Sequence, residues 1–345
     1  MRSNEERARS AGARELQFGS SHESRVASHA VAAALALALA CTTASAQDYP
    51  ARPVRFLVPN PPGGGTDLVA RIVAQKVSEK WGVNLVADNR PGAGGIIAVE
   101  VAARSAPDGY TLLMAHFPLA ITVNMAKVTF DPVRDFAPVT LLAITQNVLA
   151  VHPAVPAKSV KEFIALAKSK PGELRYGSGG NGTSMHVSAE LFSLMAGARM
   201  THIPYKGAGP ALVDLIGGQV QASFVSVPAA VPHIKSGRIR ALAVTGPRRS
   251  QLVADLPTLS ETGLKGYGSE QWYGVLVPRQ TPQPVVRRLN QDFAWSLAQP
   301  DTRARLHERG FEIASDTTEE WFGRFIKSEI VKWGDVVRKA GIKAE

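Results

Sequence analysis

The chain has 345 residues, of which 45% are hydrophobic, 7% aromatic and 20% charged, and this length suits two domains rather than one. The composition excludes disordered and fibrous proteins, and the single cysteine, Cys41, excludes an intramolecular disulfide. The net charge of +10 raises the question of a nucleic-acid partner. Because the basic residues are scattered and no aromatic residues are interleaved with them, we expect no nucleic-acid partner.

Residues 1–46 are typical of a secretory signal peptide. An apolar run over residues 30–40 is followed by the triplet ASA at 44–46, which fits a cleavage site. The run is well short of the roughly 20 residues that a membrane-spanning helix needs. Cys41 lacks the leucine that lipoproteins usually carry three positions upstream, so we expect an exported chain without a lipid anchor.

Strand-like and helix-like segments alternate in the part that follows. Hydrophobic periodicity predicts strands over 54–58, 83–88 and 110–114, and helices over 66–80 and 93–104.

The same alternation restarts after about residue 147. The predicted strands are 148–151, 174–176, 201–204, 220–225, 239–244 and 274–277. A helix over 159–169 opens with Ser159 and Glu162 in the spacing of a capping box, and helices fill the chain from Pro282 to about Lys339.

Alternating strands and helices imply a mainly parallel α/β sheet with helices on both faces. Two such runs predict two lobes, of which lobe 1 is discontinuous and comprises 47–147 plus 247–345, whereas lobe 2 comprises 148–246. Ligands of open α/β sheets bind beyond the carboxyl ends of the strands, so glycine-rich loops from both lobes should meet in one cleft.

The first glycine-rich loop joins a strand to a helix. Glycines let the backbone approach a ligand, and the free N–H groups of a helix start favour an anion. Either Thr66 or Asp67 is expected to cap this helix, and Arg71 to brace Asp67 one turn later. The candidate ligand-binding residues here are Asn60, Pro61, Pro62, Gly63, Gly64, Gly65, Thr66 and Asp67.

A second loop, Gly177 to Ser184, superficially fits a dinucleotide fingerprint. That fingerprint needs an acidic residue about 20 positions later, and none stands at 201–204, so we reject nucleotide binding. The loop still offers amide and hydroxyl donors to a carboxylate, and its candidate residues are Ser178, Gly179, Asn181, Thr183 and Ser184. A third loop, 90–95, fits helix packing as well as ligand contact.

Catalytic and metal-binding signatures are absent from the sequence. It holds no G-x-S-x-G or H-E-x-x-H motif, and the histidines are dispersed without metal-ligand spacing. We therefore expect no enzyme activity, no metal and no cofactor. The alternative that stays open is a cleft hydrolase that uses Ser178 or Ser184.

Ordered motifs along nearly the whole exported part carry a family resemblance. They are YP at 49–50, VP at 58–59, PPGG at 61–64, NRPGAGG at 89–95, PDGYTL at 107–112, DFAPV at 135–139, KPG at 170–172, HIPYKG at 202–207, GGQV at 217–220, LAV at 242–244, LPT at 256–258 and WYGVLVP at 272–278. With these motifs the chain resembles the periplasmic solute receptors of the tripartite tricarboxylate transporters, the Bug/TctC family.

The resemblance implies a type II periplasmic binding protein fold, with a mixed sheet flanked by helices in each lobe, that closes on a carboxylate in the cleft between its two loops. It also implies delivery of the ligand to membrane transporter subunits, and we expect a monomer. The sequence departs from the family pattern at His116-Phe117, which replaces a small, glycine-rich stretch, and at Gln221 and Val225, where aspartates are common. His116 and Val225 are therefore further candidate ligand-binding residues. Without a carboxylate at position 225, the amino group of an amino-acid ligand would have no anionic partner there. We therefore expect the ligand to be a plain mono-, di- or tricarboxylate, aromatic acids included. A ligand sensor for a membrane kinase would use the same site.

Overall fold

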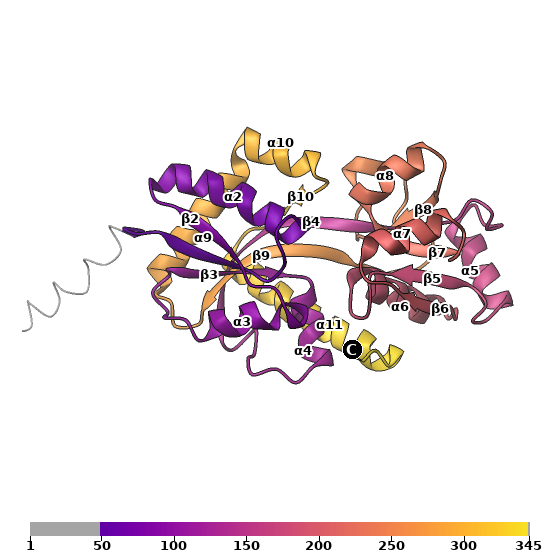
Figure 1. Cartoon of the computed structure of the whole chain (residues 1–345), viewed down its shortest axis with the longest axis horizontal. Coiled ribbons are helices and arrows are strands. Elements are labelled where there is room, and N and C mark those ends of the chain that lie inside the picture. The colour runs from indigo at the N-terminus through magenta and orange to yellow at the C-terminus, as the bar shows by residue number, and fades with distance from the viewer. Residues whose placement is uncertain (1–48, 344–345) are drawn as a thin grey trace, which may run out of the picture. The chain divides into compact units, whose positions relative to one another are not determined.

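The computed structural model describes residues 49–343, and from Arg52 onward the chain forms one compact unit (Figure 1). The predicted signal peptide and Cys41 lie outside the described residues. Within 49–343, no helix is both long and apolar enough to cross a membrane.

The strands of the unit share one sheet with the order β2-β1-β3-β9-β4-β7-β5-β6, while β8 and β10 pair with β4 from outside this path. The bounds are β1 Val54–Val58, β2 Leu85–Asn89, β3 Thr111–His116, β4 Phe136–Val151, β5 Arg175–Ser178, β6 Thr201–Pro204, β7 Ala222–Ser226, β8 Arg240–Val244, β9 Glu270–Pro278 and β10 Glu312–Ile313.

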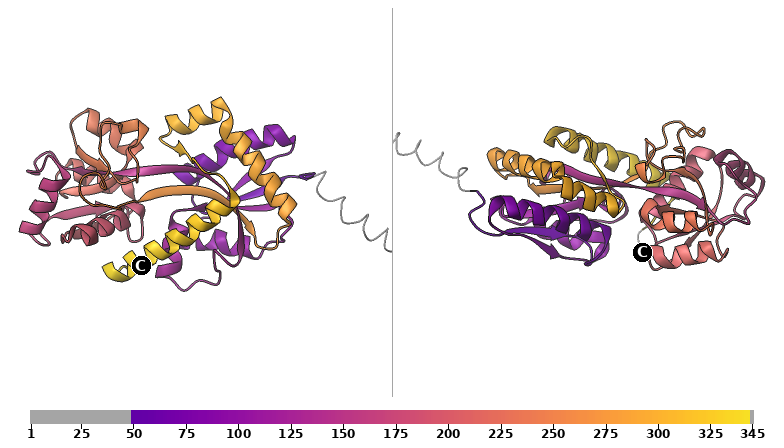
Figure 2. Two further views of the ribbon diagram at one scale, coloured as in Figure 1. Left: turned by 180° about the vertical axis from the view of Figure 1, so that it is seen from behind. Right: turned by 90° about the horizontal axis from the view of Figure 1, so that it is seen from above.

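The sheet has two halves that β4 joins. Phe136 to Gln146 pair with β9 in the first half, and Asn147 to Val151 pair with β7 and β8 in the second. Figure 2 shows β4 and β9 passing between the two groups of elements. The fold is therefore two-lobed, with β4 common to both lobes.

Helices cover both faces of each half. Their bounds are α2 Gly65–Trp81, α3 Ile96–Ala103, α4 Pro118–Met125, α5 Val160–Ser169, α6 Ser184–Ala196, α7 Ala208–Ile216, α8 Val227–Lys235, α9 Gln283–Ala298, α10 Pro300–Glu308 and α11 Glu319–Ala340, with 3-10 turns at Ala93–Gly95 and Gln251–Val253. The second half has one apolar core on each face, because Leu149 and Val151 pack into one cluster and Val148 and Ala150 into the other.

The sheet is mixed in each lobe, which confirms what the family resemblance implies, whereas the mainly parallel sheet expected from the alternation of strands and helices is wrong for the centre of the molecule. The outer pairs β1–β2, β1–β3, β5–β6 and β5–β7 are parallel, but every pair that involves β4 or β9 is antiparallel. The predicted strands 148–151 and 274–277 are only parts of these two long strands. Alternating apolar residues indicate that a segment is a strand, but they do not show whether it runs parallel or antiparallel to its neighbour, because that neighbour comes from a distant part of the chain.

The capping predictions had different outcomes. Ser159 Oγ accepts the N–H of Glu162 (3.2 Å), and the Glu162 carboxylate accepts the N–H of Lys158 (2.7 Å), so the predicted capping box at α5 is confirmed in its first part and shifted by one residue in its second. Thr66 and Asp67 do not cap α2, because the helix already begins at Gly65 and Gly64 is its N-cap.

Candidate ligand-binding site

A cavity of ≈ 350 Å³ lies where the two halves of the sheet meet. Its lining residues come from both halves and are Asn60, Gly65, Thr66, His116, Phe117, Pro118, Asn147, Gly179, Thr183, Ser184, Met185, Gly207, Ala208, Ser226, Gln271 and Tyr273. Pockets for small ligands typically have volumes of about 300–1,000 Å³, so the size suits one small molecule.

Within residues 49–343, five helices begin at this cavity: α2, α4, α6, α7 and α8. They follow β1, β3, β5, β6 and β7, so the cavity lies beyond the carboxyl ends of these strands. The amides of a helix's first turn have no partner within the helix, and the helix dipole makes that end positive. Several such ends directed at one space favour an anion there.

None of the described lining residues is Asp, Glu, Lys or Arg. Asp67 follows the lining residue Thr66 in the sequence, but its carboxylate is not part of the cavity lining. It accepts hydrogen bonds from the Gly63 N–H (2.9 Å), Arg71 Nε (2.9 Å) and Asn89 Nδ2 (2.9 Å). Burial would raise the pKa of Asp67, but these hydrogen bonds outweigh burial and hold the pKa below its usual value. The predicted Asp67–Arg71 pair is thus confirmed, and Asp67 fixes the first loop.

The first loop reaches the cavity because Gly65 has no side chain. A Cβ atom at this position would lie 3.1 Å from Tyr273 Oη and 3.3 Å from the Phe311 ring. The start of α2 therefore packs directly against β9, which brings Thr66 to the cavity wall.

The second loop is held by hydrogen bonds to its own residues. The Thr183 hydroxyl donates to Gly180 O (2.8 Å) and accepts the N–H of His186 (3.4 Å), while Gly180 N–H donates to Ser178 Oγ (3.1 Å). Thr183 is therefore the N-cap of α6, and its only hydroxyl proton is already used. The start of α6 still offers a ligand the Ser184 hydroxyl and the amides of its first two residues, Ser184 and Met185.

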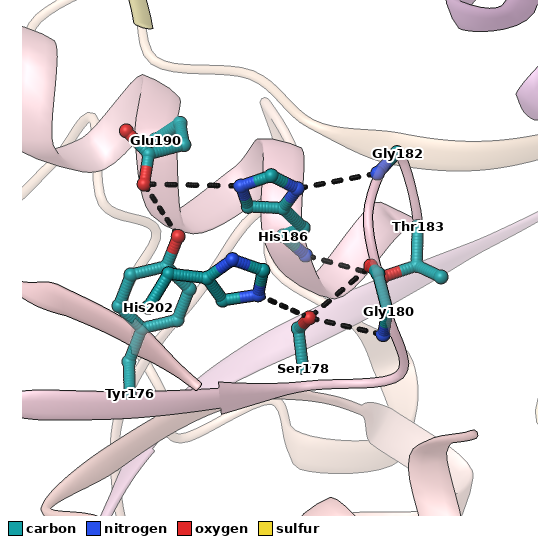
Figure 3. Close-up of polar contacts among 8 residues, drawn as sticks. All are labelled: Tyr176, Ser178, Gly180, Gly182, Thr183, His186, Glu190 and His202. Carbon is teal, nitrogen blue, oxygen red and sulfur yellow. Dashed lines mark hydrogen bonds and ion pairs between the residues drawn. The ribbon is translucent and has the colours of Figure 1, made fainter. Parts of the chain in front are cut away.

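Three aromatic rings stack beside this loop, outside the cavity lining (Figure 3). The ring centroids of His186 and His202 are 3.9 Å apart, and those of His202 and Tyr176 are 4.9 Å apart. His202 Nε2 lies 2.6 Å from Ser178 Oγ, and Tyr176 Oη donates to the Glu190 carboxylate. Burial is the main cause that lowers the pKa of both histidines, to about 3 for His186 and about 4 for His202.

Two lining residues carry buried polar atoms that lack a partner within the described structure, Asn60 Oδ1 and His116 Nε2. Burial lowers the pKa of His116 to about 3, so its ring is neutral at physiological pH. Buried polar atoms are normally hydrogen-bonded, so both are candidates for contact with a ligand or a water.

The structure brings together seven of the sequence-predicted site residues: Asn60, Gly65, Thr66, His116, Gly179, Thr183 and Ser184. It does not bring the others to the cavity lining, and these are Pro61, Pro62, Gly63, Gly64, Asp67, Ser178, Asn181 and Val225. Val225 packs into an apolar core, and its neighbour Ser226 lines the cavity instead.

Sequence reasoning missed Asn147, Ser226, Gln271 and Tyr273, which lie on or next to the central strands. Gln271 Nε2 donates to Asn147 Oδ1 (3.2 Å) across the point where the halves join. Polar residues within an apolar strand were the available signal, but their meeting depends on strand pairings between distant segments.

The fold and the cavity define a two-lobed periplasmic binding protein of type II. A family model described as "Tripartite tricarboxylate transporter family receptor" (TctC) matches residues 69–342. The chain belongs to this family of solute-binding receptors.

Relatives and solved structures agree with this assignment. Protein BugT of Bordetella pertussis is 37% identical over 302 residues, which are 87% of this chain and 92% of BugT. Rpa4515 of R. palustris, solved with adipate, has a TM-score of 0.73 at 37% identity, covering 86% of this chain and 99% of that one. MatC (Rpa3494) of Rhodopseudomonas palustris, solved with bound malate, has a TM-score of 0.70 at 32% identity. The match covers 84% of this chain and 100% of MatC.

Proposed function

We propose that this protein is an exported receptor that captures a small carboxylate between its lobes and delivers it to a membrane transporter. The observation that carries the proposal is the cavity on which five helix starts converge, with no charged side chain among its described lining residues. Two relatives support the ligand class, because Rpa4515 was solved with adipate and MatC with malate.

Binding without a lysine or arginine is energetically reasonable. A hydrogen bond to a charged group contributes about 1.5–3 kcal/mol, so a few preorganised amides can hold one carboxylate. Because the amides belong to helices fixed by the sheet, little entropy is lost when they bind.

The ligand should be a plain carboxylic acid rather than an amino acid. An ammonium group would need an anionic partner, and no aspartate or glutamate is among the described lining residues. Mono-, di- and tricarboxylates, aromatic acids included, remain the proposed class, and Asn60 and His116 can contact their polar groups.

The proposal also covers the role and organisation of the chain. Residues 1–46 serve as the signal peptide, lobe 1 comprises 47–147 plus 247–345, lobe 2 comprises 148–246, and the receptor acts as a monomer. We propose no catalysis. Ser178 is fully buried and outside the cavity lining, which disfavours it as a nucleophile. Ser184 lines the cavity, but its hydroxyl has no hydrogen bond to a histidine or carboxylate within the described structure that could activate it.

A substitution pair at Ser184 tests the amide mechanism. Ser184 is the first residue of α6 and follows Thr183 at φ −67 and ψ 158, so proline fits there and removes one N–H without breaking the helix. We expect Ser184→Pro to weaken the binding of adipate or malate at least about tenfold, the equivalent of one charged hydrogen bond. Ser184→Ala is the matched control, because it removes the hydroxyl and keeps the amide.

Isothermal titration calorimetry with adipate, malate, succinate, benzoate, aspartate and glutamate measures these affinities. Tight binding of the amino acids alone would refute the ligand class. Equal affinities for the proline and alanine variants would refute the role of the amide.

A further inference from the structure

The second ligand loop is attached to a pair of histidines that do not line the cavity. Of this loop, Gly179, Thr183 and Ser184 line the cavity, whereas His186 is 6% exposed and packs face to face on His202 with an angle of 9° between the rings. Figure 3 shows both rings beside the turn from Gly180 to Thr183.

The contact between Gly182 and His186 fixes the tautomer of the ring. Gly182 N–H lies 3.2 Å from His186 Nδ1, and a backbone N–H can only donate, so Nδ1 must carry a lone pair. The proton of the neutral ring is then on Nε2, which lies 4.0 Å from Glu190 Oε1. A second proton on Nδ1 would place two N–H groups against each other and break the attachment of the loop.

The Ser178–His202 contact supports the same turn from the other side. Ser178 Oγ accepts the Gly180 N–H (3.1 Å) and lies 2.6 Å from His202 Nε2. His202 in turn stacks between Tyr176 and His186, so the two histidines hold each other in place.

The surroundings of His186 do not favour a positive charge on it. The titratable groups that face it in the described structure are Tyr176 on β5, His202 on β6 and Glu190 on α6. Burial and then the neighbouring His202 lower the pKa of His186, and burial raises the pKa of Glu190. Burial thus opposes a charge both on His186 and on Glu190, the one carboxyl group that faces it in the described structure.

We propose that His186, supported by His202, is a positioning residue that holds the second ligand loop in its binding conformation only while its imidazole is neutral. This inference rests on the proposed binding function, but the state of the loop can be measured without any ligand. Acidification then releases the loop and weakens ligand capture, because a free imidazole takes up a proton below about pH 6.5.

Two substitutions at His186 separate positioning from packing. Asparagine places its Oδ1 near the position of Nδ1, so His186→Asn keeps an acceptor for Gly182 and removes the titration. His186→Phe keeps a stacked ring and removes the acceptor. The exposed His307 provides the matched control, His307→Asn.

Hydrogen exchange of segment 179–187, followed by mass spectrometry without ligand, is compared between variants at equal pH. At about pH 7.5 we expect wild type, His186→Asn and His307→Asn to exchange alike and His186→Phe to exchange several-fold faster. At about pH 5.5 the wild-type segment should exchange faster than that of His186→Asn, by up to about tenfold for a group with a free pKa near 6.5. Equal exchange of His186→Phe and wild type, or parallel pH profiles of wild type and His186→Asn, would overturn the proposal.

Calorimetry with adipate at the same two pH values gives the functional readout. The ratio of wild-type to His186→Asn affinity cancels the titration of adipate itself, and we expect this ratio to fall up to about tenfold on acidification. A constant ratio despite normal binding at about pH 7.5 would also contradict the proposal. Failure of adipate and malate to bind wild type at all would count against the proposed function, and the exchange measurement would still decide the role of His186.

Discussion

Glu270 is a half-buried glutamate with one buried carboxylate oxygen, and its replacement should stabilise the protein. It begins β9, pairs in register with Gln146 of β4, and its Oε1 atom has no partner within the described structure. Burial is the main cause that raises its pKa from 4.5 to about 7, opposed by Arg248 and Lys332 and reinforced by Glu312 and Glu329. The folded state therefore holds this proton more tightly than the unfolded chain does.

The sign of the pH dependence follows from this shift. The stabilising contribution of protonated Glu270 is complete below about pH 4.5 and is lost as the pH rises through about 7. A shift from 4.5 to about 7 corresponds to an upper limit of about 3 kcal/mol at alkaline pH. Glutamine resembles the protonated form, so Glu270→Gln should raise the free energy of unfolding by up to about 3 kcal/mol near pH 8 and by less than about 1 kcal/mol near pH 5.

Urea denaturation of wild type and Glu270→Gln at these two pH values measures the difference. Glu308→Gln is the control, because Glu308 is exposed and its replacement should leave stability unchanged at both. A gain for Glu270→Gln of the same size at both pH values, or a loss near pH 8, would refute the reasoning.

Three further changes in stability can be measured by the same denaturation assay. Asp292 is 1% exposed and lies 2.6 Å from Lys80 Nζ, so Asp292→Ala should destabilise the protein by about 3 kcal/mol, and a loss below about 1 kcal/mol would contradict a buried ion pair. A Cβ at Gly274 would lie 2.2 Å from Phe322 Cζ, so Gly274→Ala should cost about 1–3 kcal/mol, and an unchanged midpoint would show that the core yields. Burial lowers the pKa of His116 to about 3, so the free energy of unfolding of the wild type should fall as the pH drops below about 6.5. His116→Gln should reduce this dependence of stability on pH, and an unchanged dependence would show that other groups cause it.

The sequence predicted local features well where neighbouring residues decide them. Ser159 and Glu162 stand three positions apart, so the start of α5 could be predicted, and the glycines around Gly65 and Gly179 predicted close backbone approach. Outside the two central strands, the predicted helices and strands hold with boundaries that differ by a few residues, although the short strand β10 interrupts the segment from Pro282 to Lys339 that was expected to be helical.

Features that depend on distant partners could not be predicted in this way. Residues 136–147 were not recognised as the first part of β4, since Pro138 argues against a long strand and the partner β9 lies more than a hundred residues later. Gln271 and Asn147 reach the cavity only through this pairing, and His186 and His202 come together only because β5 and β6 are parallel neighbours.

From Ala143 to Val151, β4 pairs first with β9 and then with β7 without a register shift, so the two lobes share a single phase of side chains where they join. Gln146 pairs with Glu270 in one lobe and the very next residue, Asn147, pairs with Ser226 in the other. Since strand side chains alternate with a period of two, adding one residue at this junction would exchange Leu149 and Val151 with Val148 and Ala150 between the two cores. The number of residues in β4 thus determines which face of lobe 2 is turned toward lobe 1.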